Sequence, residues 1–311
     1  MQITKKSVQK AGKRLKKGEI LDDDIILVSS FRALHSTNIN NLISVVDETM
    51  PKPLFISSRL KRMNSIIFKL QRFASLNLDQ MQDIAGIRAV FKKESEIFEF
   101  AKNIKQKAIL SGFELIKEYD YINNPKDDGY KSYHIVFKQN GYFVELQLRD
   151  ELYHSWATAT EILGLLGNHS LKQGTALDYH KRFFYLISRL FSDDFSVIDE
   201  IKSIDEKYNI LAMLSGLKVV ADNVEKKQGG YLLIFLYYET RLLKILRYES
   251  SQLKSAKEMY QTLEKSDKMD SVLISIDDIN SLKDAYPNYY LDANKFIDEI
   301  EKRIKIWQQM N

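Results

Sequence analysis

The stretch "SYHIVFKQNGYFVELQLR" (132–149) holds two short strand-like segments separated by Gln-Asn-Gly-Tyr. Asn-Gly between two such segments is a strong signal for a β-hairpin with a tight turn. Side chains along a strand point alternately to its two faces, so the second segment has an apolar and a polar face. The polar face is either the wet side of an antiparallel strand or a row of hydrogen-bonding groups over a cleft. The apolar face would carry Val144, Leu146 and Leu148, and the polar face Phe143, Glu145, Gln147 and Arg149.

The sequence around this hairpin alternates between strand and helix patterns up to about residue 195. This predicts an α+β domain at 1–195, in which helices flank a mixed β-sheet. Further strands are expected at 83–92 and 113–122, and helices at 3–18, 23–48, 57–72, 94–111, 150–166 and 175–192.

A second domain is expected at 196–311. It begins with a helical stretch at 196–219, and "ADNVEKKQGG" (221–230) has the composition of a linker. A ββαβα order follows, which predicts a small C-terminal α+β domain whose role the sequence leaves open. Its strands are expected at 231–238, 242–248 and 271–276, and its helices at 251–265 and 291–308.

The bulk composition excludes several classes of protein. The 311-residue chain is 44% hydrophobic and 28% charged, as globular proteins are. It contains no cysteine, which excludes disulfides and thiolate metal sites and leads us to expect a cytoplasmic protein. The longest apolar run, at 231–238, is too short to cross a bilayer, and no signal-peptide core is visible, so no membrane partner is expected. The absence of P-loop, G-x-G-x-x-G and G-x-S-x-G motifs argues against the common nucleotide folds and hydrolases.

The expected helix at 57–72 is a candidate phosphate-binding element. Lys61, Ser65 and Lys69 are spaced by four residues and would share one face. Arg59 would lie in the first turn, where free backbone amides also favour anions. The alternative is that these side chains form an ordinary solvated surface.

Two carboxylates are candidate metal ligands. Asp83 opens one expected strand and Glu145 lies inside another. If the two strands are neighbours, both side chains could hold Mg²⁺, which prefers oxygen ligands and often combines one or two carboxylates with substrate phosphates.

The N-terminal twenty residues are strongly basic, with Glu19 as their only acidic residue. A basic helix of this kind could meet phosphates, for example those of tRNA, or it could be a solvated helix face. The basic residues are Lys5, Lys6, Lys10, Lys13, Arg14, Lys16 and Lys17.

Four segments, taken in order, resemble the synthetase domain of the RelA/SpoT family. The C-terminal stretch "AYPNYYLDANKF" (285–296) is also similar to a long-form subgroup with an extra C-terminal region. The four segments are "RLKRMNSIIFKL" (59–70), "MQDIAGIRAV" (81–90), "DYINNPKDDGYKSYH" (120–134) and "VELQLRDELYHSWATA" (144–159).

This resemblance implies a nucleotidyltransferase-like fold and a Mg²⁺-dependent reaction. The family transfers pyrophosphate from ATP to the ribose 3′-hydroxyl of GDP or GTP, which yields the alarmone (p)ppGpp and AMP. Asp83 and Glu145 match the family's metal-binding and catalytic carboxylates, and Glu145 also matches the proposed base. Arg59, Lys61, Ser65, Lys69 and Arg88 match the ATP site, and Lys126, Tyr130, His134, Gln147, Arg149 and His154 match the acceptor site. Tyr130 would stack on the acceptor base.

The sequence departs from the family pattern near the expected acceptor site. Lys131 stands where arginine is common, Tyr133 replaces a smaller aliphatic residue, Asp150 replaces threonine and Thr158 replaces glutamate. The acceptor is therefore open: a guanosine nucleotide, an adenosine nucleotide or the tRNA 3′-CCA end, as in toxic relatives. A catalytically silent nucleotide-binding protein is a further alternative. No hydrolase signature is visible, and a homo-oligomer or an antitoxin is a possible partner.

Overall fold

The computed structural model describes residues 3–167, 177–215, 230–237, 242–264, 266, 269–275 and 293–310. These residues form two compact units. Unit 1 comprises residues 1–124 and 131–151, and unit 2 comprises residues 125–130 and 152–311.

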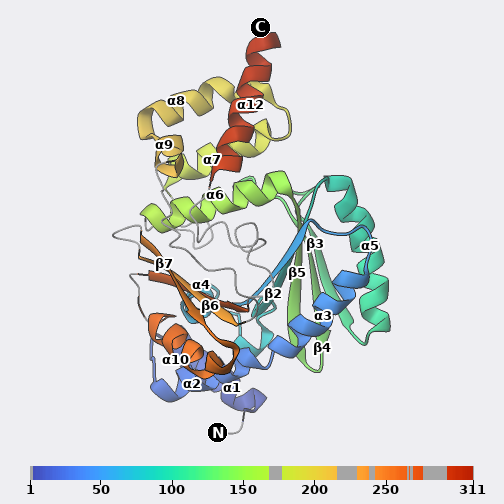
Figure 1. Cartoon of the computed structure of the whole chain (residues 1–311), viewed down its shortest axis with the longest axis vertical. Coiled ribbons are helices and arrows are strands. Elements are labelled where there is room, and N and C mark those ends of the chain that lie inside the picture. The colour runs from blue at the N-terminus through green and yellow to red at the C-terminus, as the bar shows by residue number, and fades with distance from the viewer. Residues whose placement is uncertain are drawn as a thin grey trace. The chain divides into compact units, whose positions relative to one another are not determined.

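Unit 1 is built on a five-stranded mixed sheet with the strand order β1-β2-β5-β4-β3 (Figure 1). The β2–β5 pair is parallel, and the other three pairs are antiparallel. The expected hairpin is β4–β5, with Asn140 and Gly141 at positive φ in its turn. The expected mixed sheet is thereby confirmed. The strands are β1 (Phe55–Leu60), β2 (Ala85–Phe91), β3 (Glu114–Asp120), β4 (Tyr133–Gln139) and β5 (Tyr142–Asp150).

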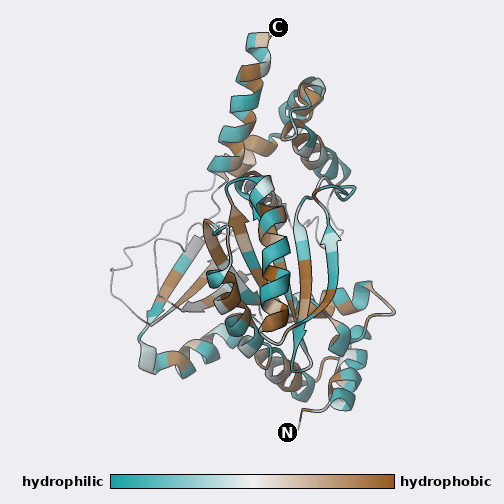
Figure 2. Ribbon diagram, turned by 90° about the vertical axis from the view of Figure 1, so that its right-hand side faces the viewer, coloured by the Kyte–Doolittle hydropathy of each residue, from teal (hydrophilic) through white to brown (hydrophobic). Residues whose placement is uncertain are grey.

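Helices α3 and α5 cover one face of this sheet. Leu42 of α3 and Phe100 of α5 share a buried cluster with Ile87, Ile135 and Leu146 of the strands. In Figure 2, where α5 lies in front of the sheet, hydrophobic and hydrophilic residues alternate along it, as an amphipathic helix requires. The helices of unit 1 are α1 (Lys5–Lys16), α2 (Asp22–Ala33), α3 (Ser36–Glu48), α4 (Met63–Arg72) and α5 (Glu94–Leu110).

Two sequence-based boundaries were wrong in ways that affect the site. The expected helix at 57–72 is a strand, β1, followed by the shorter helix α4. The six residues of β1 pair with β2, and this pairing overrides the helix-like spacing of its apolar residues. The single helix expected at 23–48 is two helices, α2 and α3, separated at Leu34 and His35.

Unit 2 combines a group of helices with a small antiparallel sheet of order β7-β6-β8. Trp156, Phe184, Ile201, Leu232 and Phe296 come from five different elements and belong to one buried cluster. The elements are α6 (Glu151–Gly167), α7 (Asp178–Leu190), α8 (Ile198–Tyr208), α9 (Ile210–Ser215), β6 (Tyr231–Tyr237), β7 (Leu242–Tyr248), α10 (Leu253–Glu264), β8 (Met269–Ser275) and α12 (Asn294–Met310).

The compact units divide at residue 151 rather than at the expected residue 195. The reason is the packing of α6 and α7: Trp156 donates a hydrogen bond to the carbonyl of Phe184, and the ring of Phe184 contacts Phe296 of α12. Of the expected linker, only Gly230 lies within the described residues. Among the described residues, no helix has the length and apolar character that a membrane crossing needs.

Candidate active site in unit 1

The sheet of unit 1 has a second face that is lined by polar side chains. Strand β5 alternates as expected: Val144, Leu146 and Leu148 are fully buried in the core, and Glu145 and Gln147 point the other way. Glu145 pairs with Gly86 of the parallel neighbour β2, so Glu145 lies on the strand next to the one that Asp83 precedes. Asp83 itself does not open the strand but lies in the turn before it.

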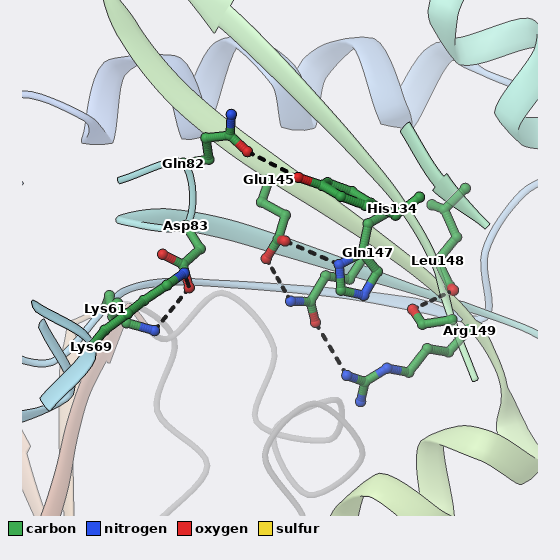
Figure 3. A network of polar contacts seen from close by, with 11 residues as sticks. Lys61, Lys69, Gln82, Asp83, His134, Glu145, Gln147, Leu148 and Arg149 are labelled. Atoms are coloured by element: carbon green, nitrogen blue, oxygen red, sulfur yellow. Dashed lines mark hydrogen bonds and ion pairs between the residues drawn. The ribbon is translucent and has the colours of Figure 1, made fainter. Parts of the chain in front are cut away.

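Asp83 is held by two lysines (Figure 3). Its Oδ2 atom lies 2.9 Å from Lys61 Nζ and 2.8 Å from Lys69 Nζ. Its Oδ1 atom is buried and has no hydrogen-bond partner among the described residues. Burial raises the pKa of the Asp83 carboxyl, but the charges of Lys61 and Lys69 outweigh this and lower it to about 2. Asp83 is therefore ionised at neutral pH.

The two lysines come from different elements. Lys69 lies in the last turn of α4, a helix that is anchored through buried Ile66 and Leu70. Lys61 follows β1, and its backbone is fixed on both sides: its N–H donates to Ile84 O at 2.7 Å, and its carbonyl accepts from Arg32 Nη1 at 3.2 Å. The sequence predicted that Lys61 and Lys69 act together, but as two residues of one helix.

Glu145 is the centre of a second polar network. Its Oε1 atom lies 3.0 Å from His134 Nδ1, and its Oε2 atom accepts a hydrogen bond of 2.7 Å from Gln147. Gln147 in turn accepts a hydrogen bond of 3.2 Å from the buried guanidinium of Arg149. Burial raises the pKa of the Glu145 carboxyl and so does the charge of Asp83, but His134 and Gln147 reverse this and leave it below its ordinary value.

The two candidate carboxylates face the same region. Figure 3 shows Asp83 and Glu145 turned to the same side, and the charge of Asp83 acts to raise the pKa of Glu145. Three of the predicted acceptor residues, His134, Gln147 and Arg149, are joined to Glu145 in the same network.

Sequence reasoning missed an aromatic group on this face. The rings of Tyr119 and Tyr121 are stacked, with centroids 5.6 Å apart, and Tyr121 packs edge-to-face on His134 at 5.2 Å. The Tyr119 hydroxyl reaches Gln82, the neighbour of Asp83, at 3.5 Å. The alternation of tyrosines in "EYDYI" (118–122) was the available signal, because period two places both rings on one side of a strand.

The remaining predicted donor-site residues lie on the elements that frame this face. Arg59 is exposed on β1 and pairs with Gly86, and Arg88 is half-buried on β2 and pairs with Gln147. Ser65 is half-buried in the first turn of α4. Arg59 was expected in the first turn of a helix, but it lies on strand β1.

Three of the predicted acceptor residues belong to unit 2. Tyr130 packs partly against the core of that unit, with its ring 6.2 Å from Trp156, and Lys126 Nζ lies 4.8 Å from the centre of the same ring. The preceding Gly129 has a φ of +87°, and an added Cβ would lie 2.6 Å from Ser188 Cβ. His154 is buried on α6. The roles of Lys126, Tyr130 and His154 stay predictions.

The carboxylates fit a magnesium ion. Asp83 Oδ1 is a buried oxygen with no hydrogen-bond partner in the described chain. Each Glu145 oxygen accepts one hydrogen bond and retains a lone pair for a further contact. The described residues contain no cluster of three or more His, Cys, Asp or Glu side chains with metal-binding geometry. Two carboxylates with substrate phosphates would match the way in which proteins commonly hold Mg²⁺.

A comparison with protein families finds a match over the part of the chain that carries these side chains. Residues 58–162 match a family model described as a region found in RelA / SpoT proteins. This match covers about a third of the chain. Asp83, Glu145 and the side chains that bind them, Lys61, Lys69, His134 and Gln147, all lie inside the matched residues.

Curated relatives resemble this chain over the same part. It is 28% identical over 160 residues to a GTP pyrophosphokinase of Photobacterium angustum, which covers 48% of this chain and 20% of that protein. It is 30% identical over 115 residues to GTP pyrophosphokinase YjbM of Bacillus subtilis, which covers 33% of this chain and 53% of that protein. The matches thus span between a fifth and about half of these two relatives.

Solved structures show a more distant likeness. Small alarmone synthetase 1 from Bacillus subtilis, bound to pppGpp, aligns with a TM-score of 0.41 and 21% identity, over 57% of this chain and 93% of that one. A GTP pyrophosphokinase family protein from Streptococcus pneumoniae aligns with a TM-score of 0.41 and 23% identity, over 62% of this chain and 98% of that one.

Proposed function

We propose that this protein transfers pyrophosphate from ATP to the 3′-hydroxyl of GDP or GTP and releases AMP. One observation carries the proposal: Asp83, which is bonded to Lys61 and Lys69, and Glu145 turn to the same side of the sheet within residues 58–162, which match the family model. Pyrophosphate transfer depends on alignment and charge neutralisation rather than on covalent chemistry. A polar face that combines acidic and basic groups provides both.

Donor and acceptor would use different parts of the polar face. Lys61 and Lys69 bind the ATP phosphates, with Arg59, Arg88 and Ser65 around them. Asp83 and Glu145 would hold Mg²⁺, which would neutralise charge on the phosphate oxygens.

Glu145 is also the group that takes the proton of the attacking hydroxyl. His134 and Gln147 fix the orientation of its carboxylate, because each bonds to a different oxygen. Because hydrogen bonding keeps Glu145 ionised, it is ready to accept a proton at neutral pH.

The proposal is tested by incubating the protein with γ-labelled ATP, Mg²⁺ and a panel of GDP, GTP, ADP, ATP and tRNA. We expect label on a guanosine nucleotide and release of AMP. Asp83→Asn and Glu145→Gln should each lower the rate about 100-fold or more, since each removes a charge at the reacting phosphate. Glu118→Gln is the matched control, because Glu118 is an ion-paired carboxylate of the same sheet that bonds to Lys105 and Tyr133 instead.

A second acceptor, the 3′ end of tRNA, is favoured by the surface of α1. Lys6, Lys10, Lys13 and Lys17 are exposed and form one stripe, since their spacing of four, three and four residues follows the helical period. Phosphate backbones bind such stripes. Label on tRNA but on no free nucleotide would establish this acceptor instead, and an absence of label throughout would leave a catalytically silent nucleotide-binding protein.

A further inference from the structure

The contact of Lys61 and Lys69 with Asp83 has an unusual charge balance. Two ammonium groups lie within 3 Å of a single carboxylate oxygen, Oδ2, while the second oxygen is buried without a hydrogen bond. A carboxylate that needed only neutralisation would be satisfied by one lysine. The pair supplies two positive charges, the same charge that a divalent cation would bring.

The Asp83 carboxylate does not readily bind both kinds of cation at once, even through different oxygens. A divalent cation at Asp83 would lie close to two ammonium groups, and like charges at such distances repel strongly in a partly buried site. The side chains of Lys61 and Lys69 are 22% and 32% exposed, and that of Asp83 is 20% exposed, so water screens this repulsion only in part. We therefore expect the metal to bind at Asp83 only after another anion has drawn the two ammonium groups away.

We propose that, in the nucleotide-free protein, Lys61 and Lys69 neutralise Asp83 in place of a divalent cation. Their ammonium groups move away from Asp83 only when a triphosphate binds. The inference rests on the proposed function, since the triphosphate of ATP is the anion that receives the lysines. Lysine suits this exchange, because its ammonium is a point charge on a flexible four-carbon stem.

The exchange couples metal binding to nucleotide binding. In the nucleotide-free protein the lysines hold the affinity for divalent cations low. When a triphosphate draws the ammonium groups away, Asp83 is released to the metal, and by thermodynamic reciprocity the metal favours the triphosphate. A protein built this way does not hold the metal between turnovers.

The test measures the affinity of nucleotide-free protein for Mn²⁺, a paramagnetic substitute for Mg²⁺, from the resonance signal of the free ion. Lys69→Met removes one ammonium and keeps an unbranched apolar stem. It should bind Mn²⁺ about tenfold more tightly or better than the unmodified chain, within the range typical of coupled sites. Lys61→Met should act in the same direction and gives an independent measurement if one variant folds poorly.

Two controls make the result specific. Lys105→Met removes an ammonium from a similar ion pair, in which Lys105 Nζ lies 2.8 Å from Glu118 and both side chains are about as exposed. It should leave the Mn²⁺ affinity unchanged. The double variant Lys69→Met/Asp83→Asn should lose the gain, because the carboxylate charge that the lysine released is then absent.

The inference is overturned if neither lysine variant binds Mn²⁺ more tightly, or if the gain survives in the double variant. These outcomes can be told apart from failure of the proposed function. The Mn²⁺ measurement needs neither ATP nor an acceptor, so it can succeed where the transfer assay fails, and it can fail where the transfer assay succeeds.

Discussion

At the scale of single residues, the site is defined by which group holds each carboxylate oxygen. Asp83 is held by lysines, and Glu145 by a histidine and an amide. Both pKa values lie below their ordinary values, but for different reasons: full charges lower that of Asp83, and hydrogen bonds contribute strongly to the lowering for Glu145. Ion pairs of the ionised carboxylate therefore contribute more to the free energy of unfolding at Asp83 than at Glu145.

The stability of the protein should depend on the ionisation of Asp83. Its pKa falls from 3.8 to about 2 on folding, so the stabilisation is present above pH 3.8 and is lost as the pH falls towards 2. A shift of this size corresponds to about 2 kcal/mol. We expect Asp83→Asn to lower the free energy of unfolding in urea by an amount that is constant from pH 7 to pH 5.

The same difference should shrink below pH 4, because the unfolded chain then takes up a proton at Asp83 that the folded chain takes up only near pH 2. A difference between the two proteins that stays constant down to pH 2.5 would contradict the assignment. Glu118→Gln serves again as the comparison, since its pKa is lowered by Lys105 and Tyr133 without any contact with Asp83.

At the scale of elements, the helices that precede β1 support the site. Helix α2 contributes Arg32, a buried side chain that donates to the carbonyl of Lys61. Helix α1 is joined to α2 by the paired side chains of Arg14 and Asp24. The N-terminal helices thus form part of the framework that aims Lys61 at Asp83.

Removal of Arg32 should weaken ATP binding without removing any group that touches ATP. We expect Arg32→Met to raise KM for ATP about fivefold, the equivalent of one hydrogen bond of about 1 kcal/mol, with a smaller effect on kcat. Arg14→Met breaks an ion pair in the same helical layer but leaves the Lys61 carbonyl bonded, so it is the matched variant. Equal effects of both variants on KM would mean that the helices act only through general stability.

Much of the sheet could be predicted from local patterns, but contacts between residues far apart in the chain could not. The alternation in β5 correctly separated core from polar side chains, because one buried face imposes a period of two. Strand β1 was missed because Leu60, at its end, continues the helical spacing of the apolar residues of α4. Arg32 carried no local signal at all: its partner is a backbone carbonyl, which leaves no trace in the sequence.

At the scale of the whole molecule, the C-terminal part is integral to the packing of unit 2. Leu232 of β6 and Phe296 and Ile300 of α12 are buried in the same cluster as Trp156 and Phe184. A chain that ends at residue 215 would therefore expose the apolar faces of α6 and α7 to water.

Truncation at residue 215 should destabilise unit 2 rather than yield a fully folded catalytic core. We expect a red-shifted fluorescence of Trp156 and faster proteolysis within α6 and α7, because the buried aromatic contacts are lost. The full-length reference carries Trp307→Phe, so that Trp156 is the only tryptophan in both proteins. A truncated protein that keeps the native fluorescence and protease resistance would show that these helices fold without the C-terminal elements.

The parallel pairing of β2 with β5 also sets the order of events during synthesis. Gly86 and Glu145 are partners, yet β3, β4 and α5 lie between them in the chain. A nascent polypeptide must therefore have left the ribosome beyond residue 150 before Asp83 and Glu145 can meet, since long-range strand pairs close late. An amino-terminal fragment that ends between residues 69 and 145 would contain both lysines and lack Glu145, so we expect it to be inactive in the transfer assay.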